Sequence, residues 1–451
     1  VLAMAAIPAA AAGPADDEQA LVKKVNGAID KGVQYLRQTR DARNQWEKLL
    51  ISNLADMDGG VTSLAVLALL NTGLPATDKD IKPALDYIRR LEPKKTYVVG
   101  IATMALAEGR DPNDKPRIQA NVDWLLKTVI RENGKIAGWS YPLEKGAMSR
   151  ADASNTQYAL LGLYAGKQAG AKIDDKVWRD LRQLYLDTMK PDGPNEAAWY
   201  YVEDKSFSPT GSFTMTAAGV SGLVIAGMGL NDNQQQLDPT TGVAAKCGIY
   251  ADTDAIARGM NWLGKRFSFF DAPQAKVAFY NVYGIERVGR LSGQRFIGKF
   301  DWYREGCEKL VAMQRPEGFW QRRGGLGFDN EPVLATSFAL LFLSKGRTPI
   351  LISKLAHGSF EHPDKNSTAV LVEKGEAAGI VGWNRKHNDA RNLTEFASRE
   401  LFQGLPLGWQ VYDPRRKNLS NKDTLHAEVG VLVQSPILYF NGHRKLAFTG
   451  E

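Results

Sequence analysis

The chain has 451 residues, of which 44% are hydrophobic and 24% charged, a composition typical of folded globular proteins. At roughly 150 residues per domain, the length predicts two to three domains. No apolar run reaches about 18 residues, which excludes a transmembrane helix within this sequence. The net charge of +7 is spread along the chain, and its longest basic cluster is Arg415–Lys417. This distribution argues against a nucleic-acid partner.

Cysteine and histidine usage limits the metal and redox chemistry of the chain. Cys247 and Cys307 are the two cysteines. They are too few for a disulfide-rich scaffold, and the sequence leaves open whether they pair. Residues 1–356 contain no histidine, so we expect no zinc site there, and we expect no metal or cofactor in the chain. The five histidines are His357, His362, His387, His426 and His443.

The first residues are small and apolar. Residues 1–12 end in an Ala10-x-Ala12 pattern, and acidic residues follow at 16–18. This order is typical of the end of a secretory signal peptide, and an alanine-rich terminus without that role is the alternative. We therefore expect an exported protein of the periplasm or cell envelope, with membrane or envelope association. Residues 1–19 would be a signal-peptide remnant and linker.

A repeated pair of helices organises residues 20–346. The first helix of each pair is amphipathic and carries an aromatic residue followed by an aliphatic one. The aromatic positions are Tyr35, Tyr87, Trp124, Tyr185 and Trp262, and a sixth copy has Lys309 instead. The second helix is nearly uniformly apolar and rich in small residues. It is expected at residues 62–69, 101–106, 156–163, 216–223, 281–288 and 336–343.

A helix that is apolar on all sides must be buried on all sides. Six such helices encircled by six amphipathic ones predict an α/α toroid with an inner and an outer ring. An open superhelical solenoid is the alternative, but it should show more regular repeat spacing. The predicted fold class is therefore mainly α, with a six-pair toroid over residues 20–346 and an α/β domain over residues 347–451.

The segment Gln314–Trp320 follows the sixth amphipathic helix, and Gly138-Trp139 follows the third. These residues resemble the glutamine–tryptophan repeats of the terpenoid cyclase and protein prenyltransferase superfamily of α/α toroids. Residues 280–289 and 302–306 are similar to a group of exported bacterial proteins. In that group, squalene-cyclase/prenyltransferase-type repeats are fused to an uncharacterised C-terminal α/β domain. The resemblance implies a toroid but no established activity.

The motifs that carry chemistry in this superfamily are missing. Its alkene-protonating cyclases resemble one another in an Asp-x-Asp-Asp motif, whereas Asp252-Thr253-Asp254 is followed by Ala255. Alkene protonation needs a strong, positioned acid, so this difference argues against a cyclase. Protein prenyltransferases hold zinc with Asp, Cys and His, and the predicted toroid has no histidine.

Polar residues precede several inner helices. Parallel inner helices would bring their N-termini to one mouth of the ring, where N–H groups and helix dipoles favour anionic or oxygen-rich ligands. Asp58 and Asp152 are candidate catalytic acids at this mouth, and Asn155, Asp329 and Trp139 are candidate ligand-binding residues. The alternative roles are helix capping for the polar residues and packing between helices for Trp139.

One inner helix carries ionisable groups within an apolar setting. Tyr280, Tyr283 and Arg287 share a face of this helix, and Glu286 lies beside Tyr283. Buried charges must be paired, so these residues either join the helix to a neighbour or line a cavity. In a cavity, Glu286 is the candidate acid and Arg287 is a candidate anion clamp, with both tyrosines contacting the ligand.

The last part of the chain alternates strands with a helix. Strands are expected at residues 349–355, 408–412 and 436–440, and a helix at 388–402, which predicts a parallel α/β layer. Residues 435–443 resemble the uncharacterised domain, which is similar to the glutamine-amidotransferase-type fold. No cysteine follows Cys307 to act as a nucleophile, and His443 is the candidate site residue. We expect residues 347–451 to be the N-terminal part of a truncated domain.

These observations favour an exported protein whose toroid binds a ligand or a partner without cyclase or zinc prenyltransferase chemistry. They leave enzymatic activity open. The first alternative is a cyclase-like or prenyltransferase-like enzyme acting on isoprenoids, and the second is a carbohydrate-active toroid with paired carboxylates. The expected ligand is accordingly apolar, an isoprenoid or a glycan, and the sequence identifies no protein partner.

Overall fold

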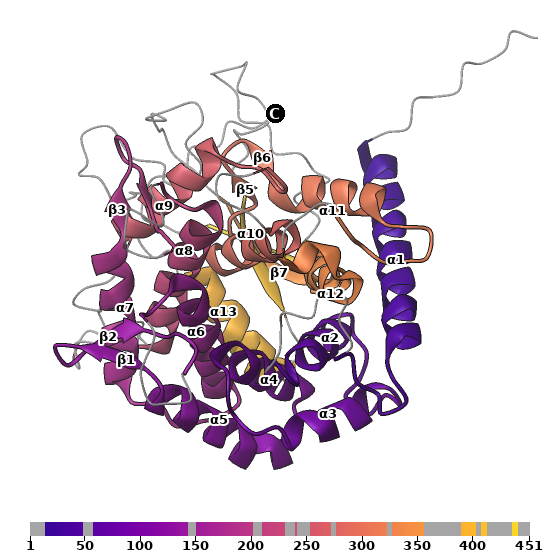
Figure 1. Ribbon diagram of the computed structural model, residues 1–451. Coiled ribbons are helices and arrows are strands. Elements are labelled where there is room, and N and C mark those ends of the chain that lie inside the picture. The colour runs from indigo at the N-terminus through magenta and orange to yellow at the C-terminus, as the bar shows by residue number, and fades with distance from the viewer. Residues whose placement is uncertain are drawn as a thin grey trace, which may run out of the picture.

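A computed structural model describes residues 14–47, 57–142, 150–201, 210–230, 240, 253–271, 277–322, 327–355, 389–402, 407–412 and 435–440 (Figure 1). Residues 1–13 of the predicted signal-peptide remnant and linker, Cys247 and all five histidines lie outside these residues, and residues 14–19 begin a helix. No helix of the described residues is long and apolar enough to cross a membrane.

Twelve helices of the described chain form two concentric rings (Figure 1). The inner ring consists of α2 (Gly60–Asn71), α4 (Thr96–Gly109), α6 (Ala153–Gln168), α8 (Phe213–Gly229), α10 (Ala278–Ser292) and α12 (Pro332–Leu343). The outer ring consists of α1 (Pro14–Thr39), α3 (Ile81–Arg89), α5 (Lys115–Lys127), α7 (Asp175–Thr188), α9 (Thr253–Lys265) and α11 (Trp302–Met313). Each predicted helix falls within one of them.

Burial follows the composition of the helices. In α8 every residue from Phe213 to Ala226 is buried, as an all-apolar helix requires. In α7 only Val177, Trp178, Leu181 and Tyr185 are buried, and they recur at helical spacing. Each large apolar side chain buried in this way contributes about 1.5–3 kcal/mol to folding. This hydrophobic contribution sorts the helices into two rings.

The ring is closed. Each inner helix packs against the next one, and α12 packs against α2. In the outer ring, α1 packs against α11 and also contacts α12. This closure confirms the predicted α/α toroid and contradicts the open-solenoid alternative.

Small residues allow the inner helices to approach closely. A Cβ atom built on Gly100 of α4 would lie 2.5 Å from the carbonyl oxygen of Tyr158 in α6. A Cβ atom on Gly162 of α6 would lie 2.8 Å from the Cα of Gly100. Any larger residue at these positions would push the two helices apart.

Four tryptophans repeat one arrangement between the rings. Each indole N–H donates to a carbonyl in the last turn of an outer helix, at 2.7 to 2.9 Å. Each tryptophan backbone N–H donates to a threonine hydroxyl of the following inner helix, at 2.9 to 3.1 Å. The four pairs are Trp46–Thr62, Trp139–Thr156, Trp199–Thr216 and Trp320–Thr336. We call this arrangement the Trp–Thr latch.

Short hairpins connect some of the helices. β1 (Ile130–Glu132) pairs with β2 (Lys135–Gly138), and β3 (Lys190–Pro191) pairs with β4 (Ala197–Ala198), both antiparallel. These two hairpins lead directly into Trp139 and Trp199. A third antiparallel pair, β5 (Phe296–Ile297) with β6 (Phe300–Asp301), connects α10 to α11.

Gln314 joins the two ends of the toroid. Its amide Nε2 donates to the carbonyl of Ala28 in α1 at 2.8 Å and to the carbonyl of Gly318 at 2.9 Å. The glutamine therefore caps backbone groups of the first outer helix and of the loop after the last one.

The residues after α12 form a small parallel sheet and a helix. β7 (Ile350–Leu355) lies between β8 (Gly408–Tyr412) and β9 (Ile437–Tyr439), and both pairings are parallel, at the three predicted strand positions. The predicted helix over residues 388–402 is instead α13 (Asp389–Phe396) followed by a single π turn over Ala397–Leu401. In Figure 1, α13 and β7 lie across the centre of the ring.

Candidate functional site

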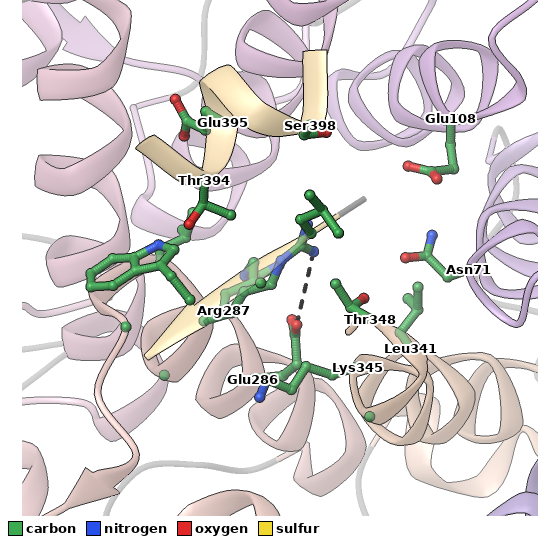
Figure 2. A pocket seen from close by; sticks show the side chains of 18 of the residues that line it. Asn71, Glu108, Glu286, Arg287, Leu341, Lys345, Thr348, Thr394, Glu395 and Ser398 are labelled. Atoms are coloured by element: carbon green, nitrogen blue, oxygen red, sulfur yellow. Dashed lines mark ion pairs between the residues drawn. The ribbon is translucent and has the colours of Figure 1, made fainter. Parts of the chain in front are cut away.

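A cavity of about 1500 Å³ lies between the toroid and the C-terminal α/β segment. Its wall includes the C-terminal ends of all six inner helices, together with residues of α13, β8 and the start of β7. Figure 2 shows Glu286 and Arg287 on one side of the cavity, and Asn71 and Glu108 on another. Thr394, Glu395 and Ser398 face it from α13 and the turn that follows.

The cavity is at the opposite mouth from the one favoured by the sequence. All inner helices run in one direction, so their C-termini converge on the cavity and their N-termini on the other mouth. Asp58, Asp152, Asn155 and Asp329 lie at the N-terminal ends and do not line the cavity. Among them, Asp58 is exposed in the turn before α2.

Asp152 and Asn155 form a cap at the start of α6. The Oδ1 atom of Asp152 accepts the backbone N–H of Asn155 at 2.8 Å, and its Oδ2 atom accepts the Asn155 amide at 2.8 Å. Burial raises the pKa of Asp152, while the hydrogen bonds from Asn155 oppose this shift. Its two bonds to Asn155 are those of a helix cap, and its Oδ2 atom also accepts the Ser140 hydroxyl at 3.5 Å.

Asp329 caps α10 from a neighbouring segment. It lies in the 3-10 turn Gly327–Asn330 and accepts the backbone N–H groups of Ala278 at 2.8 Å and Phe279 at 3.1 Å. Its side chain is fully buried, and burial raises its pKa. These bonds satisfy two N–H groups that would otherwise be unpaired at the helix start.

Trp139 is fully buried between α5 and α6 and does not line the cavity. Its indole N–H and its backbone N–H are both used in the Trp–Thr latch.

Tyr280 belongs to a polar network inside the ring. Its hydroxyl donates to Oε1 of Gln157 at 2.8 Å and lies 3.3 Å from the Ser154 hydroxyl. The hydroxyl of Tyr97 donates to that of Tyr280 at 3.5 Å and also bonds to Ser154. The Nε2 atom of Gln157 has no hydrogen-bond partner among the described residues. The network joins α4, α6 and α10 near their N-terminal ends.

Tyr283 and Arg287 lie further along α10, on the cavity wall. The Arg287 guanidinium stacks over the ring of Tyr283 at 4.3 Å and lies 5.8 Å from the ring centre of Tyr158. Burial raises the pKa of Tyr283 and Tyr158, and the positive charge of Arg287 opposes the shift in both. Three of the predicted ligand-binding or catalytic residues, Tyr283, Glu286 and Arg287, are thus brought together at the cavity.

Glu286 is buried at the cavity wall, with its Oε1 atom 4.0 Å from Nη1 of Arg290 (Figure 2). Burial raises the pKa of Glu286, and the nearby charges of Arg290, Arg287 and Lys345 partly offset the shift. The side chain of Arg290 is 59% exposed although it lies within the ring, because it projects into the cavity. Lys345 packs over the rings of Trp302 and Tyr303, and burial lowers its pKa.

The sequence did not single out the other charged residues of the cavity wall. Several of them end or follow inner helices, whereas Asp58, Asp152, Asn155 and Asp329 lie at the starts of inner helices. A sequence pattern that could have located this wall is a set of charged residues in the last turns of apolar helices. The negative end of the helix dipole lies there and favours cations. The wall carries nine basic and five acidic residues, which are Arg110, Lys115, Lys167, Arg287, Arg290, Arg295, Arg304, Lys345, Arg391, Glu108, Asp111, Glu286, Asp301 and Glu395.

The remaining candidates concern metal and thiol chemistry. No group of three or more His, Cys, Asp or Glu side chains in the described part of the chain could hold a metal ion. Cys307 is a buried free thiol whose pKa is raised by burial to about 12. Cys247, whose pairing with Cys307 the sequence left open, and the candidate His443 lie outside the described residues.

No protein-family model and no curated protein matches the chain. Similar solved structures include the apo type II terpene cyclase MstE from Scytonema, at 14% identity and a TM-score of 0.47, covering 72% of this chain and 99% of that one. An MstE variant in complex with geranylgeranyl dihydroxybenzoate has 15% identity and a TM-score of 0.48, covering 72% and 98%. An inactive α-1,6-mannanase variant of Salegentibacter in complex with α-1,6-mannotriose has 9% identity and a TM-score of 0.49, covering 72% and 99%.

These likenesses concern the fold alone. The chain has the α/α-toroid fold that its repeats predicted, with its own ring of inner and outer helices. Membership of the exported bacterial group stays a prediction.

Proposed function

We propose that this protein binds one amphipathic small molecule in the cavity between the toroid and its α/β segment, without catalysing cyclase or zinc prenyltransferase chemistry. The observation that carries the proposal is the cavity of about 1500 Å³, a volume above the usual range for small-molecule sites. Aliphatic side chains of four inner helices, among them Leu67, Leu161, Ile225 and Leu341, line it beside charged groups.

The acid at the cavity does not suit alkene protonation. Burial raises the pKa of Glu286, which makes its carboxyl group a weaker acid than an ordinary glutamic acid. Protonation of an alkene needs a strong acid that is held against it. This favours binding over the cyclase-like alternative.

The aliphatic side chains of the cavity wall also favour one class of ligand over another. An isoprenoid or another apolar body would cover the aliphatic side chains of the wall and gain hydrophobic free energy. A glycan would leave those side chains without apolar partners and would need hydrogen-bonding groups in their place. We therefore place the apolar-bodied ligand ahead of the glycan.

A neutral apolar fluorophore, N-phenyl-1-naphthylamine, tests the proposal. We expect saturable binding of one molecule per chain. Ala165→Trp, which places an indole into the cavity from α6, should weaken that binding at least about tenfold by filling the space. Ala120→Trp, on the exposed face of α5, is the matched control and should bind normally. Equal binding by both variants would contradict the proposal.

We also propose that the protein is exported to the periplasm or cell envelope, on the basis of the apolar segment before residue 13. Fractionation of a Gram-negative host that expresses the complete natural protein tests this. Recovery of all of the protein in the cytoplasm would contradict export.

A further inference from the structure

Arg287 is a buried cation with unused hydrogen-bonding capacity. Only 4% of the residue is exposed, yet it lies on the cavity wall. None of its three guanidinium nitrogens has a hydrogen-bond partner among the described residues. The nearest acid along the helix, Glu286, is paired with Arg290 instead.

Such a group is costly to the folded protein. A guanidinium removed from water loses its hydration, and this loss is normally offset by hydrogen bonds to an acid or to backbone carbonyls. Stacking over Tyr283 and Tyr158 offsets part of the cost. This stacking covers the flat face of the guanidinium and leaves the N–H groups at its edge without hydrogen-bond acceptors in the described part of the chain.

Two phenols near Arg287 share this property. The hydroxyls of Tyr158 and Tyr185 are buried and have no hydrogen-bond partner among the described residues. Both lie close enough to Arg287 for its charge to oppose the rise in their pKa caused by burial. These two phenols do not line the cavity, and neither their hydroxyls nor the nitrogens of Arg287 form a hydrogen bond with the described residues.

The charges around Arg287 favour an anionic ligand. Arg290 and Lys345 accompany Arg287 around Glu286, so three cations surround one acid whose own ionisation is disfavoured by burial. Glu108 and Glu395 face the cavity from other elements (Figure 2). Oxygen atoms of a carboxylate or phosphate would accept hydrogen bonds from a guanidinium in its own plane.

We propose that Arg287, with Arg290 and Lys345, binds the anionic head group of the ligand, a carboxylate or a phosphate monoester, while the apolar body of the ligand fills the rest of the cavity. This rests on the proposed function, and it specifies the chemistry of the ligand's polar end.

Displacement of N-phenyl-1-naphthylamine from the full chain tests the proposal, with octanoate, octyl phosphate, octan-1-ol and inorganic phosphate as competitors. We expect octanoate or octyl phosphate to compete at least about tenfold better than octan-1-ol, because charge-assisted hydrogen bonds add to the same apolar chain. Arg287→Met should abolish this preference. Arg179→Met, which removes an exposed cation of α7, should keep it.

Thermal unfolding gives an independent readout. Since Arg287 lacks hydrogen-bond partners, Arg287→Met should melt no lower than the wild type without ligand, and octanoate should stabilise only the wild type. If Arg287→Met does not fold, the competition experiment is carried out with Arg290→Met. We expect this variant to prefer octanoate over octan-1-ol less strongly than the wild type does.

The outcomes separate the two proposals. Failure of the fluorophore to bind would contradict the proposed function itself. If the fluorophore binds normally but octanoate and octan-1-ol compete equally well, only the proposal of an anionic head group is overturned. The same holds if Arg287→Met still prefers octanoate over octan-1-ol. Inorganic phosphate that stabilises the wild type as strongly as octyl phosphate would overturn the amphipathic ligand.

Discussion

At the scale of single residues, the side chains of α10 have different surroundings at the two ends of the helix. Tyr280, in its first turn, is hydrogen-bonded within the network of α4 and α6. Glu286 and Arg287, nearer its end, face a cavity and have few or no hydrogen bonds. The first arrangement stabilises the ring, and the second leaves polar groups available to a ligand.

Glu286 gives a prediction about pH. Because burial raises its pKa in the folded state, the folded protein binds more protons than the unfolded chain above the unfolded glutamate pKa of about 4.3. The stabilising contribution of Glu286 is therefore complete below that pH and is lost as pH rises through the folded pKa. We expect the melting temperature of the wild type to fall, relative to Glu286→Gln, as the pH is raised from about 4 towards neutrality.

Glu317→Gln, at an exposed position after α11, is the control and should follow the wild type across this range. Wild-type and Glu286→Gln melting curves that stay parallel at every pH would show that Glu286 does not have the raised pKa.

At the scale of elements, the Trp–Thr latch ties each of four outer helices to the inner helix that follows. In the copy formed by Trp199 and Thr216, the backbone N–H of Trp199 donates to the buried Thr216 hydroxyl at 3.1 Å. The indole of the same tryptophan donates to the carbonyl of Tyr185 at 2.9 Å. One residue thus satisfies groups of two helices while filling the space between them.

Removing the Thr216 hydroxyl tests how much the Trp–Thr latch contributes to the free energy of unfolding. Thr216→Val keeps the side-chain shape but leaves a buried N–H without an acceptor, so we expect the free energy of unfolding to fall by about 1–3 kcal/mol in urea titrations. Thr216→Ser keeps the hydroxyl and should lose less, mainly the transfer free energy of one methyl group. If the serine variant is the less stable of the two, packing of the methyl group rather than the hydrogen bond holds the latch.

At the scale of the whole molecule, the α/β segment covers the cavity by a docking contact between distant parts of the chain. The backbone N–H of Val411 in β8 donates to the carbonyl of Gly293 after α10 at 2.7 Å. The ring of Trp409 packs against the same glycine, where a Cβ atom would clash with it. Gly293 has a φ of 66°, a conformation that also favours glycine.

This contact should control how fast a ligand leaves. We expect Trp409→Ala to speed dissociation of N-phenyl-1-naphthylamine by about ten- to hundredfold in stopped-flow measurements, because an aromatic contact worth about 1.5–3 kcal/mol is lost. Leu438→Ala, at a part-exposed position of β9 away from the cavity, should leave the rate unchanged. An unaltered rate in Trp409→Ala would mean that the ligand leaves by another route.

The sequence by itself determined the ring. Helical periodicity and uniform apolarity are local properties, and a helix such as α8 that is apolar on every side can only be buried on every side. The aromatic repeat identified the outer helices, and the threonines of the latch are the first residues of the expected inner-helix ranges 62–69, 156–163, 216–223 and 336–343. Their hydrogen bonds to tryptophans 16 or 17 residues earlier were not apparent from the pattern alone.

Only the tertiary structure showed that the cavity described above lies at the C-terminal mouth of the ring. Helix dipoles and polar residues before the inner helices favoured the N-terminal mouth, but there Asp152 and Asp329 use their oxygens as helix caps. The cavity lies at the other mouth because the α/β segment docks there, through residues 293 and 411. A contact over that separation depends on where the closed ring places the end of α10, and no local pattern encodes it.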